Sequence, residues 1–170
     1  MATGTARKKN FSSFTKAEAF KLLGLTELLP WVIEAEPVTP SAFFTERLQR
    51  LQRHFDLESG EEAKKLLIDA VCDEALEGVE RIKVWKAASL EGETVTGVAD
   101  YLLAERRRYL EAPFECVVEA KKDDFEQGMA QCLVEMEACR WSIRQVGREM
   151  EILGFVTIGE GWLFFGLDWR

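Results

Sequence analysis

The sequence predicts an α/β (α+β) domain in which helices flank a mixed β-sheet. Three observations predict this class. An amphipathic helical pattern ends at Gly78, three segments rich in strand-forming residues follow, and a further helix then precedes a hairpin pattern around Gly159-Glu160-Gly161. The expected order of the core elements is therefore α-β-β-β-α-β-β.

Length and composition suit one globular domain. The chain has 170 residues, 47% hydrophobic and 31% charged, which is enough for a sizeable core. We expect a flexible polar tail over residues 1–14 and one domain over residues 15–170, with a helical extension over 15–58 and the core over 59–170. No apolar run is long enough to span a membrane, and the polar N-terminus lacks an apolar signal segment, so we expect a cytoplasmic protein.

Two helices are expected in the extension. Thr15 is a suitable N-cap for the first helix, and Gly24 is a suitable stop. Prolines then mark a connecting loop. Either Ser41 or Thr45 would begin the second helix, which runs to Phe55 because apolar residues recur there at helical spacing.

The core should begin with an amphipathic helix from Ser59 to about Glu77. Ser59 and Glu62 form a capping-box pattern at its start. Glu74 lies on the apolar stripe of this helix, where a carboxylate is costly unless it has a partner. Either the stripe has ended near the helix C-terminus, or Glu74 is an inward-facing ligand.

The remaining elements are predicted from strand propensity, turn residues and helical periodicity. They are strands over residues 82–90, 94–104 and 114–120, a helix from 123 or 124 to about 141, and strands over 152–158 and 162–168. Because the connections between the first three strands are short, these strands should be antiparallel neighbours.

A zinc site is not expected. The chain has four cysteines without a Cys-x-x-Cys pair, and His54 is its single histidine. The cysteines, which lie in apolar or helical patterns, are expected to be small buried side chains in a reducing compartment. They are Cys72, Cys116, Cys132 and Cys139.

One group of polar residues has the composition of a catalytic site. Asp100 interrupts the second strand with a charge, while Glu119 and Lys121 lie two residues apart near the end of the third and share one face. Antiparallel pairing would bring Asp100 and Glu119 side by side. Two partly buried carboxylates repel each other unless a cation lies between them, and Mg²⁺ accepts few carboxylates together with water and phosphate. These residue types therefore indicate metal-assisted phosphodiester hydrolysis, with Lys121 orienting the attacking water or stabilising charge on the phosphate.

The two segments that carry these residues resemble the PD-(D/E)xK nuclease superfamily, which has the restriction-endonuclease-like fold. The segments are Gly97-Val98-Ala99-Asp100-Tyr101-Leu102 and Val117-Val118-Glu119-Ala120-Lys121-Lys122. The similarity is greatest to nuclease domains of type I restriction subunits, and it covers about residues 59–169.

The resemblance implies a role for each matching residue. Asp100 and Glu119 would bind Mg²⁺ or Mn²⁺, and Lys121 would be catalytic. Family members often carry a glutamine on the following helix. Gln131 is the first choice for it and Gln127 the second, and the two share a helix face because they are four residues apart.

Many members of the family also place an acid on the helix before the first strand. Glu62 fits the placement seen in the family, whereas Glu74 fits the burial argument better, so both are candidate metal ligands. The proline that usually precedes the aspartate is replaced by Ala99 here, at a position that varies widely in the superfamily.

The formal net charge of −8 argues against non-specific DNA binding, because phosphate contacts require a basic face. It leaves room for a local basic patch. Arg106-Arg107-Arg108 is a candidate for such a patch, and a run of solvated charges explains it equally well. A homo-oligomer in which two sites share a basic groove is also compatible with this charge.

The function expected from these observations is a metal-dependent nuclease that hydrolyses phosphodiester bonds in DNA, with RNA as the second candidate substrate. The alternative is a catalytically silent nuclease-fold module that binds or regulates a protein or nucleic-acid partner. The acidic pair and the lysine favour the nuclease, whereas the acidic net charge favours the silent module.

Overall fold

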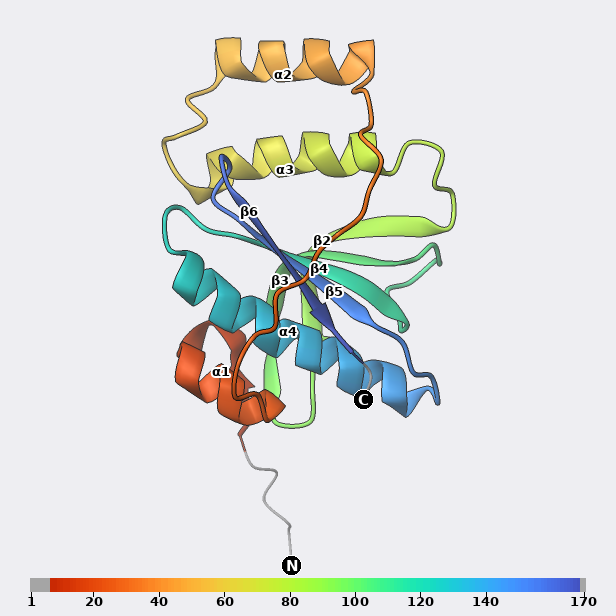
Figure 1. Ribbon diagram of the computed structural model, residues 1–170. Coiled ribbons are helices and arrows are strands. Elements are labelled where there is room, and N and C mark those ends of the chain that lie inside the picture. The colour runs from red at the N-terminus through yellow and green to blue at the C-terminus, as the bar shows by residue number, and fades with distance from the viewer. Residues whose placement is uncertain (1–6, 169–170) are drawn as a thin grey trace, which may run out of the picture.

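The computed structural model describes residues 7–168, and its core elements follow the predicted order (Figure 1). Residues 1–6 and 169–170 lie outside the described part. The elements are β1 (Lys9–Asn10), a 3₁₀ helix (Phe11–Ser13), α1 (Lys16–Leu23), α2 (Ala42–His54), α3 (Glu61–Ala75), β2 (Ile82–Glu91), β3 (Val95–Glu105), β4 (Phe114–Ala120), α4 (Phe125–Gln145), β5 (Ile152–Thr157) and β6 (Trp162–Leu167).

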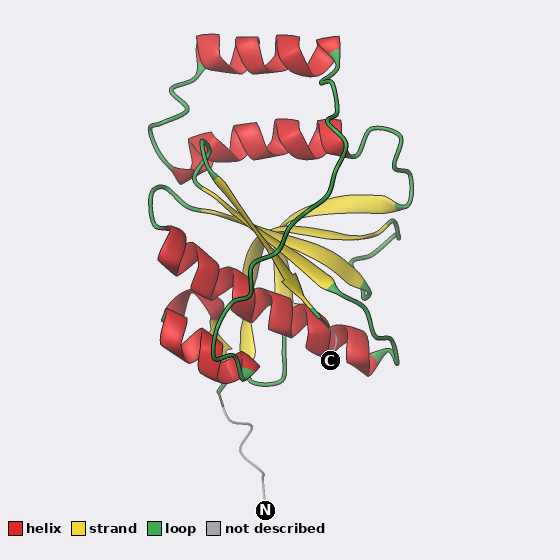
Figure 2. Cartoon of the chain, viewed as in Figure 1, coloured by secondary structure: helices red, strands yellow, loops and turns green. Residues whose placement is uncertain are grey.

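The strands form one mixed sheet with helices on both faces, which confirms the predicted fold class (Figure 2). The strand order is β1-β3-β4-β5-β6, and β2 also pairs with β3. The pairs β2/β3 and β3/β4 are antiparallel, as predicted from their short connections, whereas β4 and β5 are parallel and joined by α4. Helix α4 covers one face together with α1, and α3 covers the other, with α2 stacked on α3.

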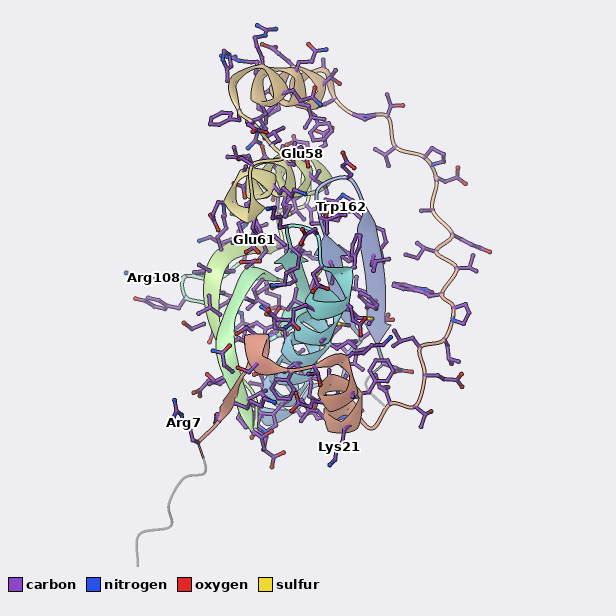
Figure 3. The ribbon with its side chains drawn as sticks, turned by 90° about the vertical axis from the view of Figure 1, so that its left-hand side faces the viewer. Arg7, Lys21, Glu58, Glu61, Arg108 and Trp162 are labelled. Carbon is purple, nitrogen blue, oxygen red and sulfur yellow. The ribbon has the colours of Figure 1, made fainter. Side chains whose placement is uncertain are left out.

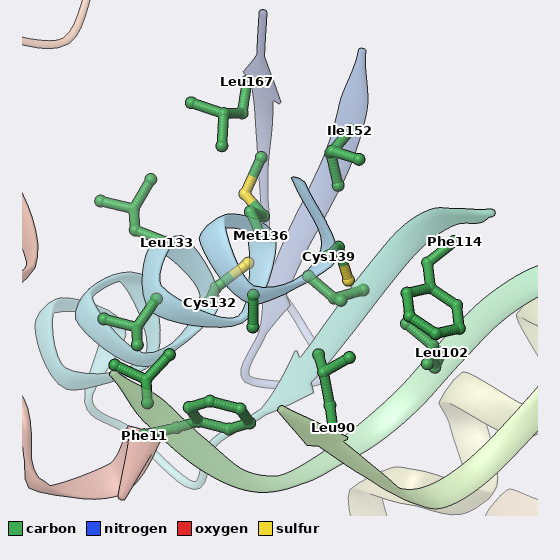
Figure 4. Packing of buried hydrophobic residues seen from close by; sticks show 14 of the residues in the cluster. Phe11, Leu90, Leu102, Phe114, Cys132, Leu133, Met136, Cys139, Ile152 and Leu167 are labelled. Atoms are coloured by element: carbon green, nitrogen blue, oxygen red, sulfur yellow. The ribbon is translucent and has the colours of Figure 1, made fainter. Parts of the chain in front are cut away.

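Side chains that alternate along β3 and β4 enter two different apolar layers. Leu102 and Val117 belong to the large cluster beneath α4 (Figure 4). Tyr101 and Val118 point to the opposite face, where they pack around Ile68 of α3. Each of these side chains is almost fully buried, which contributes about 1.5–3 kcal/mol per large aliphatic residue.

The prediction of a flexible tail over residues 1–14 is wrong for residues 9–14. Lys9–Asn10 pair with β3 in parallel, and Phe11 and Phe14 are buried in the cluster beneath α4. Two aromatic side chains three residues apart supply enough apolar surface to order this short segment.

The two helices of the extension begin where capping residues predicted them. Thr15 and Glu18 form a complete capping box at the start of α1, and Gly24 ends this helix with a left-handed conformation. Ser41, rather than Thr45, caps α2. Within residues 7–168, none of the helices combines the length and apolar character needed to cross a membrane.

The start of α3 differs from the prediction. Its N-cap is Gly60, without a side-chain cap, and the helix begins at Glu61. The Ser59 hydroxyl instead donates to the carbonyl oxygen of Asp56 at 2.7 Å, so it closes the preceding turn. The capping box of Ser59 and Glu62 is therefore not formed.

Candidate active site

Strands β3 and β4 part at the residues that the sequence singles out. Their register runs from Ala104–Phe114 to Tyr101–Val118. Beyond that point β4 continues against β5, while β3 continues against β2. We call the place where β3 and β4 separate, just beyond the Tyr101–Val118 pair, the fork. Asp100 is the first residue of β3 beyond the last β3/β4 pair, Glu119 is the first residue of β4 beyond it, and the antiparallel register, extended by one residue, sets them opposite each other.

Both oxygens of Asp100 are hydrogen-bonded. Oδ2 accepts the N–H of Ala120 at 3.0 Å. The next amide, of Lys121, donates to Thr157 of β5, so the amide of Ala120 faces β3 by the alternation of strand hydrogen bonds. The Asp100 carboxylate thus replaces a backbone carbonyl where the strands separate. Oδ1 accepts from Lys65 Nζ of α3 at 2.7 Å.

Glu119 is a buried carboxylate that is only half satisfied. The residue is 1% exposed, and its Oε1 accepts from Lys121 Nζ at 2.6 Å. Its Oε2 is buried and has no hydrogen-bond partner within residues 7–168. Burial, and then the charge of Asp100, raise the pKa of Glu119 to about 7, although Lys121 opposes the shift. The positive charge of Lys121 therefore does not offset the combined effect of burial and the Asp100 carboxylate on Glu119.

A chain of hydrogen bonds leads from Lys121 into the interior of α4. Lys121 Nζ donates to Gln131 Oε1 at 3.1 Å, and Gln131 Nε2 donates to Glu135 Oε1 at 3.0 Å. The structure thus brings the first-choice glutamine to the fork. Gln127, the second choice, donates its side-chain amide to the carbonyl oxygen of Ser12 at 3.1 Å.

Glu135 was not identified from the sequence. It is fully buried, and its Oε2 has no hydrogen-bond partner in the described part of the chain. Burial, and then the charge of Glu119, raise the pKa of Glu135 well above its ordinary value. Its sequence signal is the spacing of four residues from Gln131, which places the two on one helix face.

Helix α3 adds a lysine that the sequence analysis also missed. Lys65 Nζ lies 2.7 Å from Asp100 Oδ1, 2.7 Å from Glu62 Oε1 and 3.5 Å from Glu61 Oε1. Burial alone would lower the pKa of Lys65, but its hydrogen bonds to Asp100 and Glu62 raise it. Lys65 therefore remains charged and neutralises part of this acidic group.

Two acids of α3, Glu61 and Glu62, act on the fork in different ways. The negative charge of Glu61 raises the pKa of both Glu119 and Lys121, and Figure 3 shows this side chain between α3 and the sheet. The side chain of Glu62, the predicted candidate, is 86% exposed and contacts the fork through Lys65. Helix geometry explains the difference, because neighbouring residues lie about 100° apart around the axis.

Glu74, the other candidate acid, faces α2. Its two oxygens accept the Ser41 N–H at 2.6 Å and the Ser41 hydroxyl at 2.8 Å. A carboxylate at a helix N-terminus is stabilised by the unpaired amides and the helix dipole. The interpretation of Glu74 as an inward-facing ligand is therefore wrong. Glu74 faces α2 from the apolar stripe and anchors the start of that helix.

The arginine run of the β3–β4 loop is engaged within the protein. Arg106 Nε donates to the carbonyl oxygen of Glu80 at 2.7 Å. Arg107 bonds Glu105 at 2.9 Å and Glu111 at 3.0 Å. These contacts favour a structural role for Arg106 and Arg107 over a phosphate-binding patch.

The donor set of the fork suits a cation that keeps most of its water. Over residues 7–168, no three His, Cys, Asp or Glu side chains are grouped so that they could hold a metal ion. The fork offers two carboxylates, Asp100 and Glu119, and Mg²⁺ is commonly held by one or two carboxylates, with water and phosphate oxygens completing its shell. The unpartnered Glu119 Oε2 is a ready acceptor for such an ion.

Comparisons of the chain with protein-family models, with curated proteins and with solved structures found no match.

Proposed function

We propose that the protein is a metal-dependent nuclease that hydrolyses phosphodiester bonds in DNA, with RNA as the second candidate substrate. The observation that supports this best is the fork, where Asp100 lies beside Glu119 and Lys121 bonds Glu119 at 2.6 Å. The preference for DNA, and the restriction-endonuclease-like form of the fold, are proposed from the resemblance of the two motif segments to the PD-(D/E)xK superfamily.

In this proposal Asp100 and Glu119 hold Mg²⁺ or Mn²⁺. The ion, when bound, acts as a Lewis acid toward a phosphoryl oxygen and lowers the pKa of a coordinated water. Because burial and Asp100 raise the pKa of Glu119 to about 7, a nearby divalent cation would favour its ionised form and relieve the repulsion between the two carboxylates.

Lys121 would supply the positive charge that meets the reacting phosphate. Its ammonium group is held by Glu119 and by Gln131 Oε1, which leaves one N–H for a water or a phosphate oxygen. Gln131 presents its oxygen to Lys121 because its amide nitrogen donates to Glu135. The buried acid therefore orients the glutamine, and the glutamine orients the lysine.

A catalytically silent module that acts through a protein or nucleic-acid partner is the second candidate. The ion pair between Lys65 and Asp100 favours it, because an ammonium group 2.7 Å from Asp100 neutralises that carboxylate without a metal. The formal net charge of −8 favours it as well, since it disfavours binding to nucleic acid.

Cleavage assays with a matched pair of lysine variants test the proposal. Single- and double-stranded DNA and RNA are incubated with the protein and Mg²⁺ or Mn²⁺. We expect metal-dependent cleavage that Lys121→Ala reduces by about 10²–10³-fold, the loss typical when a charge-stabilising donor is removed. Lys122→Ala removes the neighbouring exposed lysine and should stay within about twofold of the wild type.

Each alternative result has a definite meaning. Absence of cleavage by a folded, metal-bound wild type would reject the nuclease in favour of the silent module. Equal cleavage by the wild type and by Lys121→Ala would indicate a contaminant or another site. Calorimetry with Mn²⁺ tests the ligands separately: Asp100→Asn or Glu119→Gln should abolish binding, and binding that survives both changes would reject the site.

A further inference from the structure

The fork already contains a cation that belongs to the protein. Lys65 extends from α3 so that its ammonium group lies among three carboxylates, those of Asp100, Glu62 and Glu61. The side chain of Lys65 is 16% exposed, whereas that of Glu62 is 86% exposed. The lysine therefore bridges a carboxylate of the fork and a carboxylate at the protein surface.

Two carboxylate oxygens of the fork have no hydrogen bond from β4 or from Lys121. Asp100 Oδ2 is taken by the Ala120 amide, and Glu119 Oε1 is taken by Lys121. Glu119 Oε2 has no partner in the described structure, and Asp100 Oδ1 is held by Lys65 at 2.7 Å. The Lys65 ammonium thus holds the oxygen of Asp100 that β4 leaves free.

We propose that Lys65 competes with the divalent cation for Asp100, and that metal binding moves its ammonium group onto Glu62 and Glu61. This inference rests on the metal site of the proposed function. A divalent cation on the same carboxylate oxygen would lie close to the Lys65 ammonium group, and the repulsion between the two positive charges favours departure of the lysine from Asp100. Its destination is already formed, because Nζ lies 2.7 Å from Glu62 Oε1.

Two consequences follow for the chain without a metal ion. Lys65 offsets part of the repulsion between the paired acids by pairing with Asp100. The same ion pair lowers the affinity for the metal, because each binding event has to break it. Lys65 is therefore a positioning residue that sets the metal concentration at which the fork is occupied.

Calorimetric titration of the full-length chain with Mn²⁺ tests this competition. Lys65→Met keeps the length of the side chain and removes its charge, and we expect it to bind Mn²⁺ about tenfold more tightly than the wild type, the factor that corresponds to about 1.4 kcal/mol. Lys86→Met is the matched control. Lys86 lies on β2, and its Nζ pairs with Asp69 of α3 at 2.7 Å instead of with Asp100. This variant should therefore bind Mn²⁺ within about twofold of the wild type.

A double-mutant cycle identifies the destination of the lysine. Glu62→Gln should weaken Mn²⁺ binding in the wild type by a fewfold and should have little effect in the Lys65→Met background, because Glu62 acts through Lys65. Lys65→Gln, which keeps a hydrogen-bond donor toward Asp100, replaces Lys65→Met if that variant does not fold. Circular dichroism of each variant establishes that it is folded.

The outcomes separate the competition from the nuclease. If the wild type binds Mn²⁺ and the charge-removing variant binds it equally or less tightly, the competition is refuted and the proposed function stands. If only the variant binds, the competition is supported and the wild type is better described as the silent module. If neither folded protein binds, both proposals are refuted.

Discussion

The buried carboxylate of Glu119 should make the protein less stable as the pH rises through neutrality. Its pKa is raised from 4.5 to about 7, mainly by burial and then by Asp100. Below pH 4.5 the carboxyl is protonated in both the folded and the unfolded chain. Between these two pKa values the unfolded chain releases the proton and the folded chain retains it, so the free energy of unfolding falls as the pH rises.

The size of the effect follows from the shift. A change of about 2.5 pKa units, at about 1.4 kcal/mol per unit, corresponds to about 3 kcal/mol. Most of this loss occurs between pH 4 and pH 8, because the two pKa values lie inside that window. Glu119→Gln has no ionisable group at this position and avoids the loss.

Urea unfolding followed by tryptophan fluorescence, at several values from pH 4 to pH 8, measures the effect. We expect the free energy of unfolding of Glu119→Gln to rise relative to the wild type by about 3 kcal/mol across this range. Taking the difference between the two proteins removes the titration of most other groups. Glu160→Gln, which changes an exposed carboxylate in the β5–β6 turn, should show a difference that stays nearly constant. A constant difference for Glu119→Gln as well would refute the reasoning.

Two further predictions concern packing and capping. Gly154→Ala should lower the free energy of unfolding by about 1–3 kcal/mol, because the added Cβ would approach Met136 Sδ and lie 2.7 Å from Cys132 Sγ. Gly60→Ala is the control in the same urea titration. It should have little effect, because there is open space around the new Cβ. Ser41→Ala should cost the first turn of α2 about 1 kcal/mol, seen as faster amide hydrogen exchange within α2; unchanged exchange there would contradict the capping role of Ser41.

The strands and most helix ends could be predicted from the sequence because local signals determine them. Capping residues marked the starts of α1 and α2, and short turns fixed the antiparallel order of β2, β3 and β4. That order also explains why Asp100 and Glu119 could be paired before the structure was known. Counting back from the Ala104–Phe114 pair sets Asp100 opposite Val118, and the β-bulge between Leu103 and Ala104 shifts the register by one residue so that Asp100 lies opposite Glu119.

The other members of the site could not be found in this way. Lys65 contacts Asp100 across 35 positions of the chain, and the rotation of α3 that selects Glu61 over Glu62 depends on how the helix packs. The partner of Glu74 could not be predicted, because an apolar stripe does not reveal which neighbour covers it. Here that neighbour is α2, with its N-cap Ser41. The order of Lys9–Asn10 was missed because a two-residue strand has almost no pattern of its own.

The fork has a mechanical consequence. Four registered pairs join β3 to β4, whereas nine join β2 to β3. The sheet therefore has two parts, β2 with β3 and β4 with β5 and β6, which are joined by a short stretch of β3/β4 pairing. Asp100 belongs to the part that contains β3, and Glu119 with Lys121 belongs to the part that contains β4. Both groups lie where the β3/β4 pairing ends. The separation of the two carboxylates therefore depends on a short stretch of strand pairing inside the sheet rather than on a surface loop.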